Sequence, residues 1–267
     1  MGCHRVNEAG GRCRALVLVA IWLASLLLLP AARAADQIGT IARVKASIVA
    51  IGTFQPTRAP AFQFRATGFV VGDGLLVATN AHALPSLLDR EHREALAIAI
   101  PGGGSEAQVR EASELAVDEG TDLALLKISG TALPALKLGD SESVREGQSI
   151  LFTGFPIGAV LGLSAATHRG MVAAITPIAI PPPTAARLDP RIVRRLTTGA
   201  FPVLQLDATA YPGNSGSPVY DPESGVVLGI VNMVFVKGTK EAALTQPSGI
   251  TYAVPVKHLQ ALLNNAR

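Results

Sequence analysis

One short segment, residues 212–218 (Pro-Gly-Asn-Ser-Gly-Ser-Pro), surrounds a serine with residues that form tight turns. Gly213 and Gly216 permit positive φ angles, and Asn214 tolerates the left-handed region of backbone conformation. A loop of this kind can direct backbone N–H groups toward one point beside the Ser215 hydroxyl, where they would stabilise the charge on a carbonyl oxygen under attack. The segment therefore predicts a nucleophilic serine with an oxyanion hole, although such a cluster taken alone is more often a surface turn.

The base predicted for this serine is His82. A serine hydroxyl is a weak nucleophile until a base takes its proton, so the hypothesis requires an imidazole within hydrogen-bonding distance. Beyond residue 34 the chain has four histidines, and His82 follows a β-rich run and begins a loop, in Ala-Thr-Asn-Ala-His-Ala-Leu. We interpret His92, His168 and His258 as surface or core residues without a role in the chemistry.

The group predicted to orient His82 is Asp122. The orienting carboxylate should be short and stand at the edge of an apolar strand, where burial strengthens its hydrogen bond to the imidazole and selects the tautomer. Asp122 is followed directly by the apolar run Leu-Ala-Leu-Leu-Lys-Ile. Asp118, four residues earlier, is the competing candidate, and the apolar run favours Asp122.

Short β-rich runs, separated by turns with glycine and proline, must position these residues. The clearest hairpin has its turn at residues 72–74 (Gly-Asp-Gly), and its second strand leads to His82. Many short strands and few helical periods predict an all-β barrel or sandwich. Residues 256–263 alone have the apolar spacing of a short closing helix. Further strands are expected at residues 95–100, 109–117, 123–128, 149–153, 170–175, 203–206, 218–220, 226–236 and 249–253.

Two segments interrupt the strand pattern. Residues 133–147 are polar enough to link two β-lobes of comparable size. Residues 176–198 contain three consecutive prolines and a basic run, which indicate a long surface insertion or flap.

The N-terminal residues 1–34 have the pattern of a secretory signal peptide. Three arginines precede fifteen residues that are apolar apart from one serine, and an Ala-x-Ala site follows at residues 32–34. The competing interpretation is an uncleaved anchor, but the apolar run is shorter than the roughly 20 residues that a spanning helix needs. We therefore expect an exported protein, periplasmic or extracellular, with no membrane span after cleavage.

Charge and composition after residue 34 exclude several classes of function. Removing the signal takes away four arginines and one glutamate, so the remaining basic and acidic side chains are equal in number and no nucleic-acid partner is expected. Both cysteines, Cys3 and Cys13, precede the apolar run, so neither a disulfide nor thiol chemistry is expected. No His-Glu-x-x-His or paired Cys/His spacing occurs, so we expect no metal and no cofactor. The sequence leaves a homo-oligomer open.

Three motifs occur in the order His, Asp, Ser: Thr-Asn-Ala-His at 79–82, Thr-Asp-Leu-Ala-Leu-Leu-Lys at 121–127 and Gly-Asn-Ser-Gly-Ser-Pro at 213–218. Together they resemble the chymotrypsin-like serine proteases, and most closely the HtrA/Deg branch of that family. The resemblance extends over about residues 38–264. Supporting segments are residues 68–71, 154–158, 207–208 and 252–255.

The resemblance implies an all-β fold of two six-stranded Greek-key barrels and a short C-terminal helix, with the site in the cleft between the barrels. Residues 35–267 would form one trypsin-like protease domain. The first barrel would span about residues 38–135, the second about 145–255, and the closing helix about 256–264.

The resemblance also implies a role for each site residue. His82 would be the general base and then the general acid, Asp122 would orient it, and Ser215 would form the acyl-enzyme. The backbone N–H groups of Gly213 and Ser215 would make the oxyanion hole, and Asn214 would shape the turn between them.

The chain departs from this family at several points. HtrA proteins usually carry PDZ domains after the protease, and this chain ends soon after the predicted closing helix. Ser217 stands where the family more often has glycine, which is similar to bacterial glutamyl endopeptidases, but their histidine in the next strand is absent. Asn214 replaces the aspartate with which digestive relatives bind a newly freed N-terminus, so activation by that ion pair is not expected.

The specificity pocket is expected to be walled by Thr209 and Tyr211, before the serine, and by Val231 and Met233 in a later strand. These side chains are uncharged, so the expected preference is for small or medium apolar residues before the cleaved bond.

The resulting prediction is an exported serine endopeptidase that acts on polypeptides, including unfolded proteins. The alternative is a catalytically latent double barrel that serves as a binding or partner-regulated module. An α/β-hydrolase is disfavoured because that fold needs Gly-x-Ser-x-Gly and the order Ser, Asp, His.

Overall fold

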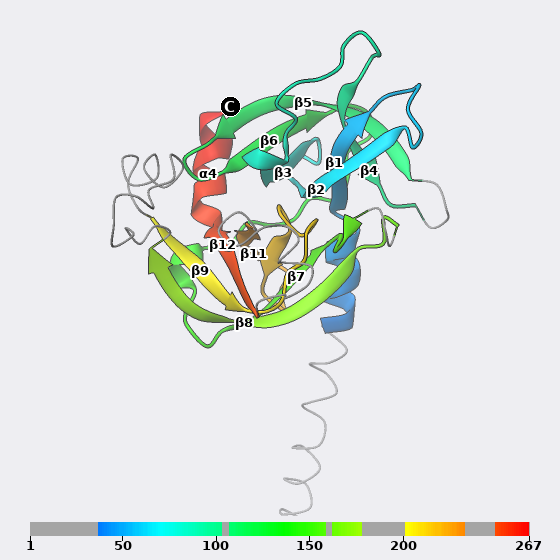
Figure 1. Ribbon diagram of the computed structural model, residues 1–267. Helices are drawn as coiled ribbons and strands as arrows, with labels where there is room; N and C mark the ends of the chain where they lie inside the picture. The colour runs from blue at the N-terminus through cyan, green and yellow to red at the C-terminus, as the bar shows by residue number, and fades with distance from the viewer. Residues whose placement is uncertain (1–36, 103–106, 159–161, 178–200, 233–248, 267) are drawn as a thin grey trace, which may run out of the picture.

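The computed structural model describes residues 37–102, 107–158, 162–177, 201–232 and 249–266. In this part of the chain the strands form two closed antiparallel barrels of six strands each, and a C-terminal helix packs beside them (Figure 1). The predicted fold of two six-stranded barrels with a closing helix is therefore confirmed. The expected signal segment, most of the expected insertion at 176–198, and Met233 lie outside the described residues.

The first barrel closes in the order β1-β2-β3-β6-β5-β4, with β4 pairing back onto β1. The predicted hairpin around residues 72–74 is present, since β2 and β3 pair up to Val71 and Leu76. Strand β1 was not predicted from the sequence. Its run Ile-Val-Ala-Ile-Gly-Thr-Phe is buried on both faces, so it lacks the alternation of apolar and polar residues that marks a strand with one exposed face. The strands are β1 (Ile48–Phe54), β2 (Phe62–Val71), β3 (Leu76–Asn80), β4 (Ala95–Ile100), β5 (Gln108–Asp118) and β6 (Leu123–Ile128).

The second barrel closes in the order β10-β11-β12-β9-β8-β7, with β10 pairing back onto β7. β8 is longer than the predicted strand at 170–175, because its first half pairs with β7 and its second half with β9. The strands are β7 (Ser149–Gly154), β8 (Ala166–Pro177), β9 (Pro202–Asp207), β10 (Pro218–Tyr220), β11 (Val227–Val231) and β12 (Ile250–Pro255).

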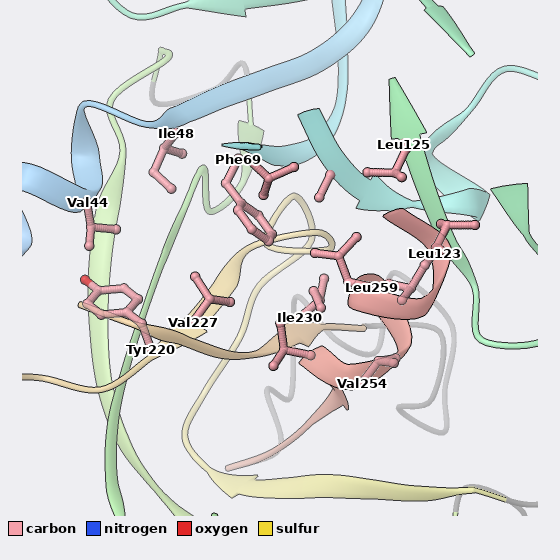
Figure 2. Close-up of a cluster of buried hydrophobic side chains, with 14 of the residues drawn as sticks. Val44, Ile48, Phe69, Leu123, Leu125, Tyr220, Val227, Ile230, Val254 and Leu259 are labelled. Carbon is pink, nitrogen blue, oxygen red and sulfur yellow. The ribbon is translucent and has the colours of Figure 1, made fainter. Parts of the chain in front are cut away.

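One hydrophobic cluster fills the space between the barrels and fixes how they sit against each other (Figure 2). The helix α4 (Val256–Asn265) enters this cluster through Val256, Leu259 and Leu262, which share one face of the helix. Each buried side chain of this size stabilises the fold by about 1.5–3 kcal/mol. Besides Leu259, the members labelled in Figure 2 are Val44, Ile48, Phe69, Leu123 and Leu125, followed by Tyr220, Val227, Ile230 and Val254.

A polar cluster lies in the first barrel around Glu94. The Glu94 carboxylate accepts hydrogen bonds from the Asp89 backbone N–H at 3.0 Å, the Thr53 hydroxyl at 2.6 Å and the Arg58 guanidinium at 2.8 Å. These three donors lower the pKa of Glu94 to about 2, and the Asp89 N–H has the largest effect.

No helix among the described residues is long and apolar enough to cross a membrane.

Candidate active site

His82 and Asp122 meet where β3 ends and β6 begins. β3 continues into a 3-10 turn, Ala81–Ala83, that carries His82, and the pairing of Asn80 with Leu123 brings Asp122 beside that turn. One oxygen of the Asp122 carboxylate accepts the His82 backbone N–H at 2.9 Å. The other lies 2.6 Å from Nδ1 of the His82 ring. The strand register therefore produces the pair that the sequence predicted.

This contact determines what the imidazole can do. Asp122 is 8% exposed, so its interaction with the ring is shielded from solvent. A proton on Nδ1 satisfies the Asp122 oxygen and leaves Nε2 of His82 free to accept a proton. The competing carboxylate, Asp118, instead caps its own turn by accepting from Gly120 N at 2.9 Å and Thr121 Oγ1 at 2.8 Å.

A third residue holds Asp122, and the sequence analysis missed it. Asn232, which follows β11 in the second barrel, is fully buried and donates from Nδ2 to Asp122 Oδ2 at 2.7 Å. The only signal in the sequence is a single polar residue at the end of an apolar run. Asn232 adds a second donor to the oxygen that faces the His82 ring, and it ties the second barrel to the carboxylate of the first.

The serine loop leaves two backbone N–H groups unused. Ser215 is 6% exposed, and the Asn214 N–H closes the preceding turn onto Tyr211 O at 2.9 Å, which fits its predicted role in shaping the turn. Among the described residues, neither the Gly213 N–H nor the Ser215 N–H donates a hydrogen bond. Both therefore remain available to an acceptor such as an oxyanion.

Two positions in this loop require glycine. Gly213 has φ +103°, and a Cβ there would lie 2.3 Å from Phe155 O. Gly216 has φ +84°, and a Cβ there would lie 2.0 Å from Thr67 O. The loop thus approaches other backbone segments more closely than any side chain allows.

The first barrel anchors the serine loop next to the strand that leads to His82. Thr67 N in β2 donates to Ser215 O at 2.9 Å, and the Thr79 hydroxyl in β3 donates to Thr67 O at 2.8 Å. No hydrogen bond joins the Ser215 hydroxyl to His82 within the described ranges. Such bonds are often long in unliganded sites and tighten when substrate binds.

The predicted pocket residues have different environments. Thr209 and Tyr211 are half-buried in the segment before the serine. The Val231 side chain is fully buried in the core of the second barrel, and its backbone pairs with the serine loop through Gly216 N at 2.9 Å. Thr251, which was not predicted, holds this segment by accepting from Ala210 N at 3.1 Å.

The remaining histidines make other contacts. His92 Nδ1 lies 2.8 Å from Asp89, and the half-buried His168 stacks on Phe152 with ring centroids 4.7 Å apart. Burial lowers the pKa of His168 below its usual value, which keeps its ring neutral at pH 7. His258 contacts Phe201 at 4.5 Å between ring centroids. In the described part of the chain, no group of three or more Cys, His, Asp or Glu side chains could hold a metal ion.

The paired barrels, with these motifs at their junction, define the chymotrypsin-like class of fold. Residues 66–230 match the family described as "Trypsin-like peptidase domain", so the chain belongs to that family of serine proteases. A solved structure described as "HtrA-type protease AlgWS227A with tripeptide" has a TM-score of 0.60 at 21% identity and covers 85% of this chain and 62% of its own. At that identity the likeness concerns the fold.

Relatives of this chain include DegP-like and Hho-type serine proteases. A probable periplasmic serine endoprotease DegP-like from Halomonas elongata is 28% identical over 190 residues, which are 71% of this chain and 32% of the relative. The putative serine protease HhoA from Synechocystis sp. is 26% identical over 216 residues, 78% of this chain and 44% of the relative. The chain thus spans less than half the length of these relatives.

Proposed function

We propose that this chain is an exported serine endopeptidase that hydrolyses peptide bonds through His82, Asp122 and Ser215. The observation that carries the proposal is the buried Asp122 carboxylate, which accepts both the backbone N–H and the ring of His82. That arrangement holds the imidazole with Nε2 available as a base. The names of the relatives, periplasmic serine endoproteases, and the signal-like N-terminal segment support export.

The proposed reaction begins when His82 Nε2 takes the proton of the Ser215 hydroxyl as Oγ attacks the scissile carbonyl carbon. The tetrahedral oxyanion accepts hydrogen bonds from the N–H groups of Gly213 and Ser215. Asp122 stabilises the imidazolium, which then protonates the leaving amine. The acyl-enzyme is hydrolysed when water, deprotonated by His82, attacks the ester and Ser215 leaves with a proton.

The proposed substrates are polypeptides in extended or unfolded conformation, with a small or medium apolar residue before the cleaved bond. The segment before the serine supports this preference because it carries no charge: Ala208, Thr209, Ala210 and Tyr211. A site without a charged wall gives no electrostatic reason to select a charged side chain.

The test is hydrolysis of casein by the purified chain beside Ser215→Ala, with a fluorophosphonate probe as a second readout. We expect the unmutated chain to cleave casein and to be labelled at Ser215, and the variant to do neither. A folded, unmutated chain that neither cleaves nor is labelled would refute the proposal and favour the latent binding module.

A further inference from the structure

Thr67 lies in β2 of the first barrel and contacts the serine loop of the second. Its side chain is fully buried. The Thr67 hydroxyl donates to Gly213 O at 2.7 Å, while the Thr67 backbone N–H donates to Ser215 O at 2.9 Å. Thr67 therefore binds the backbone carbonyls of both neighbours of Asn214, Gly213 and Ser215.

The carbonyls of Pro212 and Asn214 are held as well. Pro212 O accepts from Ile157 N at 2.7 Å, and Asn214 O accepts from Ser217 N at 3.0 Å. Since the N–H of a peptide points opposite to its C=O, these two bonds direct the Gly213 N–H away from Ile157 and the Ser215 N–H away from Ser217. The Gly213–Asn214 peptide lies between them, and its orientation sets the angle between the two N–H groups. That peptide is held at its N–H by Tyr211 O, at 2.9 Å, and at its C=O by the Thr67 hydroxyl.

The same hydroxyl also binds the segment that holds Pro212. Thr67 Oγ1 accepts a hydrogen bond from Phe155 N at 3.0 Å, two residues before Ile157. It thus donates to one segment of the second barrel and accepts from another. Packing around it is close, since a Cβ on Gly154 would lie 2.8 Å from Thr67 Oγ1. Valine has the shape of threonine, but it can neither donate nor accept these hydrogen bonds, because a methyl group replaces the hydroxyl.

We infer that Thr67 is a positioning residue of this site. Its hydroxyl, supplied by the first barrel, orients the Gly213–Asn214 peptide and so aligns the two N–H groups that would stabilise the oxyanion. This inference rests on the proposed function, because it concerns the same reaction. It predicts that the hydroxyl affects turnover more than substrate binding, since the oxyanion forms only in the transition state.

The test compares Thr67→Val with Thr67→Ser in the full chain, on a chromogenic peptide amide that the unmutated chain cleaves. We expect Thr67→Val to lower kcat about 10- to 100-fold with KM changed less than about twofold, as for a modest misplacement of stabilising donors. Thr67→Ser keeps the hydroxyl and should stay within about threefold of the unmutated kcat. A peptide aldehyde, which uses the oxyanion hole, should bind Thr67→Val more weakly by a factor similar to the loss in kcat/KM.

Thr53→Val is the matched control, because it removes another buried, hydrogen-bonded threonine hydroxyl from the first barrel, in the polar cluster around Glu94. It should lower the melting temperature and leave kcat unchanged. If Thr67→Val does not fold, Thr67→Ala takes its place, and its kcat is compared with that of Thr67→Ser in the same way.

Three results would overturn the inference. A folded Thr67→Val with unmutated kcat would remove the hydroxyl from the mechanism while leaving the proposed function intact. Equal losses in the Val and Ser variants would assign the effect to any change of the Thr67 side chain and not to its hydroxyl. An unmutated chain that is inactive toward every peptide and toward the fluorophosphonate probe would overturn both the inference and the proposed function.

Discussion

Replacing Asp122 by asparagine should stop turnover while leaving the shape of the site unchanged. In the structure one Asp122 oxygen accepts the His82 backbone N–H, and the other accepts from the ring of His82 and from Asn232. If the asparagine keeps its oxygen toward the backbone N–H, its NH2 group faces the His82 ring. Nδ1 must then become the acceptor, and the proton moves to Nε2, where it blocks general-base catalysis.

The alternative orientation of that asparagine is less favourable. It would place the NH2 group against the His82 backbone N–H, two donors face to face, in a site that is nearly buried. In the first orientation, by contrast, the second donor that the NH2 group meets belongs to the Asn232 side chain and not to the fixed backbone of His82. The wrong tautomer therefore prevails, and we expect Asp122→Asn to lower kcat about 10,000-fold, equivalent to about 5.5 kcal/mol of transition-state stabilisation.

The assay is kcat on a chromogenic peptide amide, with circular dichroism to verify folding. Asp118→Asn is the matched control, because Asp118 caps a turn four residues away and does not contact His82. It should lower the free energy of unfolding by about 1 kcal/mol and leave kcat within about twofold. The reasoning is refuted if Asp122→Asn keeps more than about a tenth of the activity, or if Asp118→Asn loses as much.

Three further predictions concern single contacts. Asn232→Ala removes a buried donor to a carboxylate, so it should lower the free energy of unfolding by about 1.5–3 kcal/mol in urea titrations and lower kcat as well; unchanged kcat would remove Asn232 from the site. Gly213→Ala places a Cβ 2.3 Å from Phe155 O at a positive φ, so it should abolish fluorophosphonate labelling, and a labelled, folded variant would contradict the loop geometry. Because the pKa of Glu94 is about 2 in the folded chain against an ordinary value of 4.5, its stabilising contribution is complete above pH 4.5 and is lost as pH falls toward 2. Urea titrations at pH 5 and pH 3 should therefore show a smaller difference for Glu94→Gln than for the unmutated chain, and equal differences would refute the assignment.

The sequence predicted those parts of the site whose signals are local. The hairpin at residues 72–74 and the apolar run after Asp122 placed His82 and Asp122 at the ends of neighbouring strands, where the register brings them into contact. Thr67 and Asn232 could not be found in this way. The apolar run before Asn232 indicates only its orientation, Thr67 has no local signal, and the partner of each lies more than a hundred residues away in the other barrel.

The alternation of side chains along a strand bears on Val231, one of the predicted pocket residues. Val231 was expected in the pocket wall, but its side chain lies in the core of the second barrel and only its backbone reaches the serine loop. Successive side chains of a strand point to opposite faces, so the residue directed at the site from this strand end is the next one, Asn232. A polar residue directly after an apolar run was the signal for this orientation.

Each barrel binds residues of the proposed site that belong to the other barrel. The second barrel supplies Asn232, which binds the Asp122 carboxylate of the first, and the first barrel supplies Thr67, which binds the Gly213 and Ser215 carbonyls of the second. Neither half of the proposed site is therefore complete within its own barrel. The hydrophobic cluster between the barrels sets the distance across which these contacts form, so its side chains bear on the site's geometry as well as on stability. These contacts hold the proposed oxyanion loop by hydrogen bonds from the other barrel, without an ion pair to a carboxylate at position 214.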